Sequence, residues 1–220
     1  MVTRLQAFAV AIIAVITVAV VASALCLEIG KRPSTSLHWN VNIGDEFIYE
    51  LENTYIHSEK NYNSTIFALM AAINHTRIKT EVFNLPDIPL MIDGKTFSFD
   101  IVNQSKIHCS FENATGLPQD YGYIINQPLS SSLLPVGDWE LLDWCFGNEI
   151  DEAFYPGTYT SRLQENSFSI GYELWAGDEI FRWSANTTLD SGVPQKALIE
   201  IDSLSVGLHF IFRFSLVPEY

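Results

Sequence analysis

Residues 208–217 read Leu-His-Phe-Ile-Phe-Arg-Phe-Ser-Leu-Val, with a phenylalanine at 210, 212 and 214. Alternation of period two that is rich in aromatic side chains is typical of a β-strand with one buried face. Three preceding segments show the same pattern and are predicted as strands: 167–174, 179–188 and 196–202. Turn residues at 190–194, Asp-Ser-Gly-Val-Pro, separate two of them. The last third of the chain is therefore predicted to be an antiparallel meander.

The same alternation predicts strands farther upstream, at 47–52, 77–84, 97–101 and 107–111. Together with the meander, these segments favour a mainly β protein of the α+β type. We expect a curved antiparallel sheet or a sandwich with one or two short helices, preceded by an N-terminal hydrophobic helix.

One helix is expected in the second half of the chain. Asp138 can cap its N-terminus and Gly147 can end it. Between these residues, apolar side chains recur at helical spacing: Trp139, Leu142, Cys145 and Phe146. Such a stripe is typical of a helix that packs on the core.

A long apolar run precedes the predicted domain. Residues 5–27 contain no charged side chain, and about 20 apolar residues suffice to cross a membrane as a helix. Ala22-Ser23-Ala24 also fits a signal-peptidase site, and Cys26 suggests a lipoprotein box, although Leu25 before it fits that poorly. We interpret 1–27 as a signal peptide or signal-anchor helix, 28–36 as a linker and 37–220 as a single β-rich extracytoplasmic domain.

Potential glycosylation sites favour an outer location. Five Asn-x-Ser/Thr sequons are present, at Asn63, Asn74, Asn103, Asn113 and Asn186. With 13 Asn and 32 Ser or Thr in 220 residues, chance gives roughly two. Clustering of these residue types in turns is the alternative explanation. The chain is predicted to face outside on the cell membrane or to be secreted, with the membrane as a partner if the N-terminal helix is not cleaved.

The charge is strongly acidic, with 26 acidic against 12 basic residues. Residues 107–161 contain no Lys or Arg, which argues against a nucleic-acid partner. Candidate metal ligands in this stretch are Asp138, Asp143, Glu149, Asp151 and Glu152. Their spacing does not match a calcium-binding loop, so we predict a solvated acidic face and no cofactor.

Two cysteines, Cys109 and Cys145, lie within the predicted domain. An exported compartment permits a disulfide between them. Two buried free thiols are the alternative. No Cys-x-x-Cys pair or zinc-ligand spacing occurs.

Motifs of catalysis or nucleotide binding are missing. The sequence has no Gly-x-Ser-x-Gly, His-Glu-x-x-His, phosphate-binding loop or dinucleotide fingerprint. His108 and Cys109 are neighbours on a predicted strand, so their side chains should point to opposite faces. No catalytic residue is assigned. The paired carboxylates of an extracellular hydrolase, the further alternative, come together only in the folded chain and form no local motif.

The N-terminal apolar segment and three short segments carry a resemblance to other proteins; the short segments are 41–49, 134–139 and 192–194. They resemble a group of uncharacterised archaeal membrane-anchored ectodomains, which implies no activity. The late meander with its Asp-x-Gly-x-Pro turn is also similar to that of LolA-type lipoprotein carriers. That resemblance implies a curved antiparallel sheet that holds acyl chains against a helix.

The sequence favours a non-enzymatic domain that binds a protein partner or ligand through its sheet. A carrier of apolar or lipid ligands is the alternative, and a hydrolase is a further one. An open apolar cavity would favour the carrier, whereas a filled core with an exposed patch would favour the binding module. A cleft with converging carboxylates or a histidine would favour an enzyme.

Overall fold

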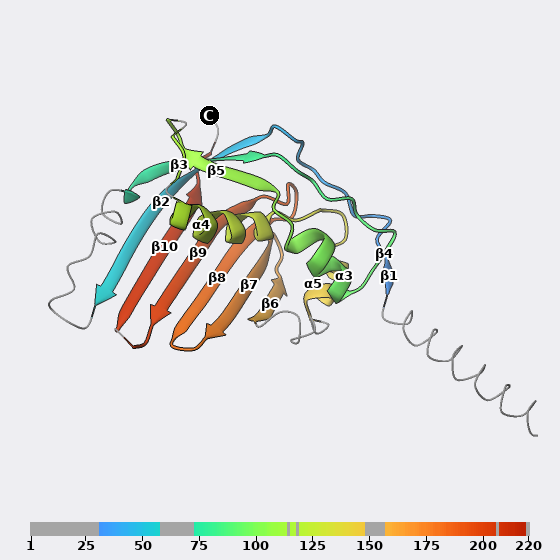
Figure 1. The fold of residues 1–220 in the computed structure, drawn as a ribbon. Coiled ribbons are helices and arrows are strands. Elements are labelled where there is room, and N and C mark those ends of the chain that lie inside the picture. The colour runs from blue at the N-terminus through green and yellow to red at the C-terminus, as the bar shows by residue number, and fades with distance from the viewer. Residues whose placement is uncertain are drawn as a thin grey trace, which may run out of the picture.

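The computed structural model describes residues 31–57, 73–113, 115–117, 119–147, 157–205 and 207–218. Within these ranges, eight strands form one open antiparallel sheet in the order β5-β3-β2-β10-β9-β8-β7-β6 (Figure 1). These strands are β2 (Glu46–His57), β3 (Thr76–Val82), β5 (Ile107–Phe111), β6 (Gly157–Leu163), β7 (Ser167–Ala176), β8 (Glu179–Thr188), β9 (Pro194–Ser203) and β10 (Leu208–Leu216). Two short strands, β1 (Arg32–Pro33) and β4 (Met91–Ile92), form a separate pair. The protein is mainly β, as predicted.

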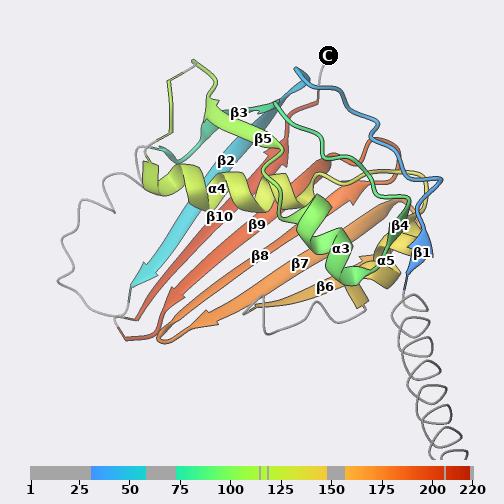
Figure 2. The same cartoon turned by 45° about the vertical axis from the view of Figure 1, so that its right-hand side comes forward.

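Helices cover one face of the sheet, which we call the inner face. Helix α4 (Gln119–Ser132) lies across it and contacts β5, β8 and β9, while α5 (Trp139–Gly147) contacts β6 (Figures 1 and 2). Helix α3 (Gly94–Phe97) continues into a π-helix, η1 (Ser98–Val102). The two views also show β3 and β5 curling over α4. Of the two predicted architectures, the open antiparallel sheet is observed and the sandwich is not. The described residues form three short α-helices where one or two were expected.

The alternating side chains sort between the two faces as expected. Tyr49 and Leu51 of β2 are buried on the inner face, whereas Glu50 and Glu52 point outward and are exposed. Phe212 and Phe214 of β10 are buried beside them. The predicted meander is confirmed, and its last strand pairs with β2, so the two ends of the domain meet in the middle of the sheet.

Residues 97–101 are helical, so the strand predicted there is wrong. The Asp93 carboxylate accepts a hydrogen bond from the Thr96 main-chain N–H at 2.7 Å and caps α3. Phe97 and Ile101 are fully buried four residues apart, which suits a helix as well as it suits a strand. Phe99, the third residue of the alternating pattern, is 42% exposed, as expected for a helix and not for a strand with Phe97, Phe99 and Ile101 on one buried face.

Besides the two-residue strands β1 and β4, two longer elements were not predicted, α4 and β6. Helix α4 contains Pro128, and proline inside a helix removes one main-chain hydrogen bond. Its core contacts, through Ile125 and Leu129, offset that loss. Strand β6 carries many hydroxyl side chains and forms the sheet edge, where it pairs only with β7 among the described strands.

Hydrogen bonds join three segments that are far apart in the sequence. The Leu134 main-chain N–H donates to Gly192 at 3.0 Å, and the indole of Trp139 donates to the Leu189 carbonyl at 3.1 Å. His38 and Val136 exchange main-chain hydrogen bonds at 3.0 and 2.8 Å. The segments around residues 38, 136 and 190 thus lie side by side.

The N-terminal run, residues 1–30, lies outside the described residues. Across the part of the chain that the structure describes, no helix has the length and apolar character needed to span a membrane.

Candidate functional site

A cavity of about 420 Å³ lies between α4 and the inner face of β6, β7 and β8. Its lining residues come from the end of η1, from α4 and from the three strands. They are Asn103, Ile124, Gln127, Ser131, Tyr159, Tyr172, Leu174, Phe181 and Trp183. Most of this lining is apolar or aromatic, as in pockets that bind small organic ligands.

Three aromatic side chains form the strand side of the cavity. The ring centroids of Tyr159 and Tyr172 are 4.7 Å apart, and Trp183 lies 6.2–6.3 Å from both. Their strands pair in register, Tyr159 with Tyr172 and Tyr172 with Trp183. Mutual packing therefore fixes these rings before any ligand arrives.

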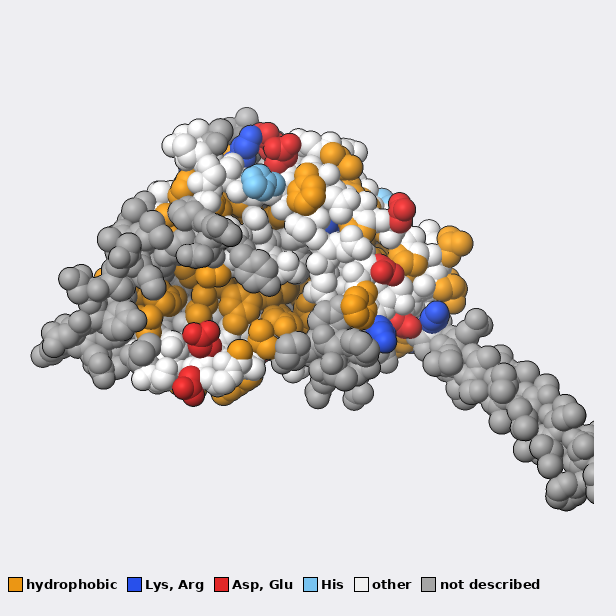
Figure 3. Space-filling model, viewed as in Figure 1, with side chains coloured by type: hydrophobic (Ala, Val, Ile, Leu, Met, Phe, Trp, Pro, Cys, Tyr) orange, Lys and Arg blue, Asp and Glu red, His pale blue; other side chains and the backbone are white. Residues whose placement is uncertain are grey.

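An apolar row extends from the cavity across the sheet. Leu174, Phe181, Ile201, Phe210 and Tyr55 are directly opposed, each to the next, on β7, β8, β9, β10 and β2. All five are only partly buried, and Tyr55 is 46% exposed. Four steps between strands give the row a length of about 19 Å. Figure 3 shows hydrophobic side chains gathered in the hollow beneath α4, on this face of the sheet.

Neutral polar groups line the η1 and α4 side of the cavity. The Tyr159 hydroxyl donates to Asn103 Oδ1 at 2.9 Å, and Asn103 Nδ2 donates to Ser98 Oγ at 2.9 Å. On α4, Gln127 Nε2 donates to Ser131 Oγ at 3.1 Å. The described residues of the lining supply amide and hydroxyl groups, and none of them is Asp, Glu, Lys, Arg or His.

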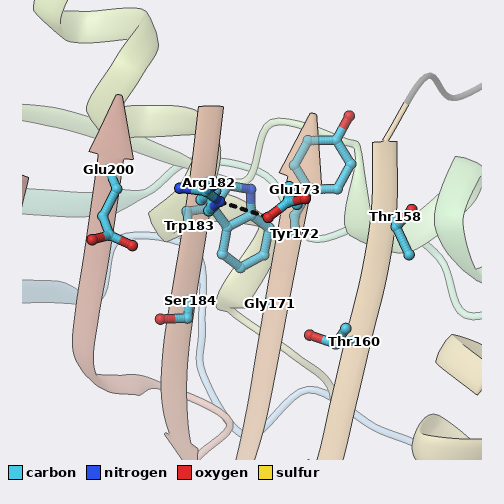
Figure 4. Close-up of a pocket in the computed structure, with 9 residues that line it drawn as sticks. All are labelled: Thr158, Thr160, Gly171, Tyr172, Glu173, Arg182, Trp183, Ser184 and Glu200. Atoms are coloured by element: carbon cyan, nitrogen blue, oxygen red, sulfur yellow. Dashed lines mark hydrogen bonds and ion pairs between the residues drawn. The ribbon is translucent and has the colours of Figure 1, made fainter. Parts of the chain in front are cut away.

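The opposite, outer face carries a second depression of about 400 Å³ over Gly171 (Figure 4). It exists because Gly171 has no side chain between Thr160 and Ser184 on the neighbouring strands. Glu173, Arg182 and Glu200 are also part of its lining. The described lining of this depression includes charged side chains, whereas the described lining of the inner cavity is neutral.

Arg182 forms ion pairs with two carboxylates on the outer face. Its guanidinium lies 2.6 Å from a Glu173 oxygen and 2.8 Å from an Asp202 oxygen. A hydrogen bond from the Trp175 indole, with those from Arg182, lowers the pKa of Glu173. Both partners of Arg182 are held by strands β7 and β9, so the positive charge is already compensated.

His209 extends this network on β10. Its Nδ1 lies 2.5 Å from Asp202 Oδ1, and its Nε2 lies 3.9 Å from Glu200 Oε1. A histidine held by a carboxylate occurs in catalytic triads, where the other ring nitrogen faces a hydroxyl nucleophile. Here the other nitrogen faces a second carboxylate, so the geometry does not activate a nucleophile.

Of the five predicted acidic candidates, the structure describes Asp138 and Asp143. Asp138 caps α5 by accepting from the Leu141 main-chain N–H at 2.9 Å, which confirms its predicted capping role. Asp143 accepts a hydrogen bond from Ser161 at 2.6 Å. Glu149, Asp151 and Glu152 lie outside the described residues. Among the described residues, no group of three or more His, Cys, Asp or Glu side chains is placed to hold a metal ion.

Cys109 and Cys145 are free, buried thiols, so the structure corrects the predicted disulfide. Cys109 lies on β5, at one edge of the sheet, whereas Cys145 lies on α5, which packs against β6 at the other edge. Burial raises the pKa of each thiol to about 12. Strand order, which spacing in the sequence does not reveal, separates the two cysteines.

The sequons differ in their surroundings. Asn113 is exposed, and its Oδ1 accepts from the main-chain N–H and hydroxyl of Thr115. Asn186 is exposed on the outer face of β8, and Asn74 accepts from the Asn53 main-chain N–H at 2.8 Å. Asn103 lines the cavity with both amide atoms bonded. Asn63 lies outside the described residues.

Comparisons with protein-family models, curated proteins and solved structures find no match for this chain. Function is therefore inferred from the geometry of the inner face.

Proposed function

We propose that this domain binds an elongated apolar ligand, such as an acyl or prenyl chain, in the cavity beneath α4 and along the apolar row. The observation behind this proposal is that the cavity and the apolar row are continuous. Leu174 and Phe181 line the cavity and also begin the row that ends at Tyr55. A volume of about 420 Å³ falls in the range of small-molecule sites.

A favourable binding free energy requires a ligand with a long apolar chain. Burying each methylene contributes about 0.8 kcal/mol, whereas association itself costs about 4–15 kcal/mol. We expect affinity to rise about fourfold per added methylene until the row is filled. A row of about 19 Å accommodates many such steps.

The inner face supports this proposal better than it supports a protein-binding surface. Its half-buried apolar side chains lie in a hollow roofed by α4 (Figure 3), whereas protein-binding patches are typically flat and rimmed by polar residues. The charged groups of the outer face are paired with one another. A role outside the cytoplasm, anchored or secreted, belongs to the same proposal and rests on the N-terminal run and the sequons.

Nile red, an uncharged dye that fluoresces in apolar sites, provides the test with the full chain. We expect saturable binding, weakened at least tenfold by Phe181→Glu, which places a charge in the cavity. Tyr55→Glu, at the far end of the row, should weaken displacement of the dye by long chains more than by short ones.

Matched controls place the same charge on the outer face of the same strands. Ser184→Glu on β8 and Thr54→Glu on β2 are exposed positions and should leave binding unchanged. Thermal unfolding of all four variants checks that they fold. Absence of saturable binding, or equal losses from inner and outer substitutions, would contradict the proposed function.

A further inference from the structure

We infer that the ligand is an uncharged amphiphile, with a hydroxyl, ester or amide group held at Asn103, Tyr159, Gln127 and Ser131 and its apolar chain directed along the row toward Tyr55. This inference rests on the proposed function and adds the chemistry of the polar group and the direction of the chain.

The direction follows from where the polar groups lie. Asn103 and Tyr159 are at the β6 end of the cavity, and Gln127 and Ser131 project from α4. The apolar row starts at Leu174 on β7 and runs away from them to β2. A ligand with a polar end and an apolar chain matches this asymmetry in only one orientation.

Among the described residues, the cavity offers no cationic side chain to an anionic group. Lys106, three residues after Asn103, is fully buried and directs its Nζ to three main-chain carbonyl oxygens, and it is not part of the lining. Arg182 is compensated by two carboxylates on the outer face. Burial of an unpaired carboxylate or phosphate is costly, and the net charge of −14 adds repulsion.

A cationic group is disfavoured for a corresponding reason. Among the described residues the lining holds no carboxylate, and the rings of Tyr159, Tyr172 and Trp183 already contact one another at tilted or edge-on angles. A cation recognised by aromatic rings needs their faces turned toward it. Neutral donors and acceptors remain, and they match hydroxyl, ester and amide groups.

Three amphiphiles with one chain length test the inference, each used below its micelle concentration at pH 8. They are 1-monomyristoylglycerol, myristate and tetradecyltrimethylammonium, and the readout is displacement of Nile red from the full-length protein. We expect the monoglyceride to bind at least tenfold more tightly than either ion. Tyr159→Phe, which removes one hydroxyl, should weaken monoglyceride binding about threefold to tenfold.

The outcomes separate the two proposals. If Nile red binds but myristate or the ammonium equals or exceeds the monoglyceride, the inference fails while the proposed function stands. Failure of all three to displace bound Nile red also overturns it, as does an unchanged monoglyceride affinity in Tyr159→Phe. If Nile red itself does not bind, the proposed function fails.

Discussion

Lys106 is a fully buried lysine whose charge is surrounded by main-chain oxygens. Its Nζ donates to the carbonyls of Ile101, Val102 and Gln104 at 2.6, 3.2 and 3.4 Å. Burial lowers the pKa of Lys106 to about 7. The carbonyls at the end of η1 act in the opposite direction, because a helix C-terminus favours a cation. Lys106 therefore ties the end of η1, and with it Asn103, to the core.

This arrangement predicts a pH-dependent contribution to stability. The folded pKa of about 7 lies below the ordinary 10.5, so between these values the unfolded chain binds more protons and stability rises with pH. Lys106→Met should lower the free energy of unfolding by about 1–3 kcal/mol, because it leaves buried carbonyls unpaired. The deficit of the variant relative to the natural chain should be larger at pH 9.5 than at pH 6.5.

Urea denaturation of both proteins at the two pH values provides the measurement. If the difference in unfolding free energy between the natural chain and Lys106→Met is the same at both pH values, Lys106 keeps an ordinary pKa in the folded state, which would contradict the prediction.

At the scale of elements, Gly192 allows the β8–β9 turn to contact the segment that leads into α5. Its φ is +73°, and a Cβ there would lie 2.0 Å from the Leu134 carbonyl oxygen. Gly177, in the β7–β8 turn, has a φ of +63° but open space around the same position. The two glycines thus share a backbone conformation and differ in their surroundings.

Alanine at each position should separate conformational strain from close approach. Gly177→Ala is expected to cost about 1–2 kcal/mol of unfolding free energy, for the left-handed conformation alone. Gly192→Ala should cost about 1–3 kcal/mol more than Gly177→Ala, because the turn must move away from Leu134. Chemical denaturation measures both values. Equal losses would mean that the contact with Leu134 relaxes freely.

At the scale of the whole molecule, the sequons bear on location. A glycan on Asn103 would have to displace Tyr159 and enter the cavity, whereas Asn113 is exposed. If the domain is exported in a glycosylating host, the folded protein should carry a glycan at Asn113 and none at Asn103. Peptide mapping before and after glycosidase treatment tests this, with Asn113→Gln as the control. Modification at Asn103 in folded protein, or protease protection with no glycan, would contradict it.

Local patterns were enough to predict most of the sheet. The strands that became β2, β3, β5 and β7–β10 each bury one face, so their side chains alternate within a few residues. The start of α5 was predicted for a similar reason, because a capping residue acts on its own helix. The strand expected at 97–101, the missed α4 and the missed β6 show the limit. Their local signals were ambiguous, and packing against distant residues determined their conformation.

The candidate site depended on pairings between distant parts of the chain. Alternation in the sequence indicated that Phe210 faces one side of its strand. Only the extension of β2 to His57 and its register with β10 place Tyr55 opposite Phe210. Asn103 stood out in the sequence only as a sequon, because its partner Tyr159 lies 56 residues away. The sequence by itself determined most strands of the sheet, the acidic charge and the apolar N-terminal run, since each depends on local sequence or composition. Tertiary structure alone determined the cavity, the apolar row and the separation of the two cysteines, because strand order and register bring together residues that no local pattern connects.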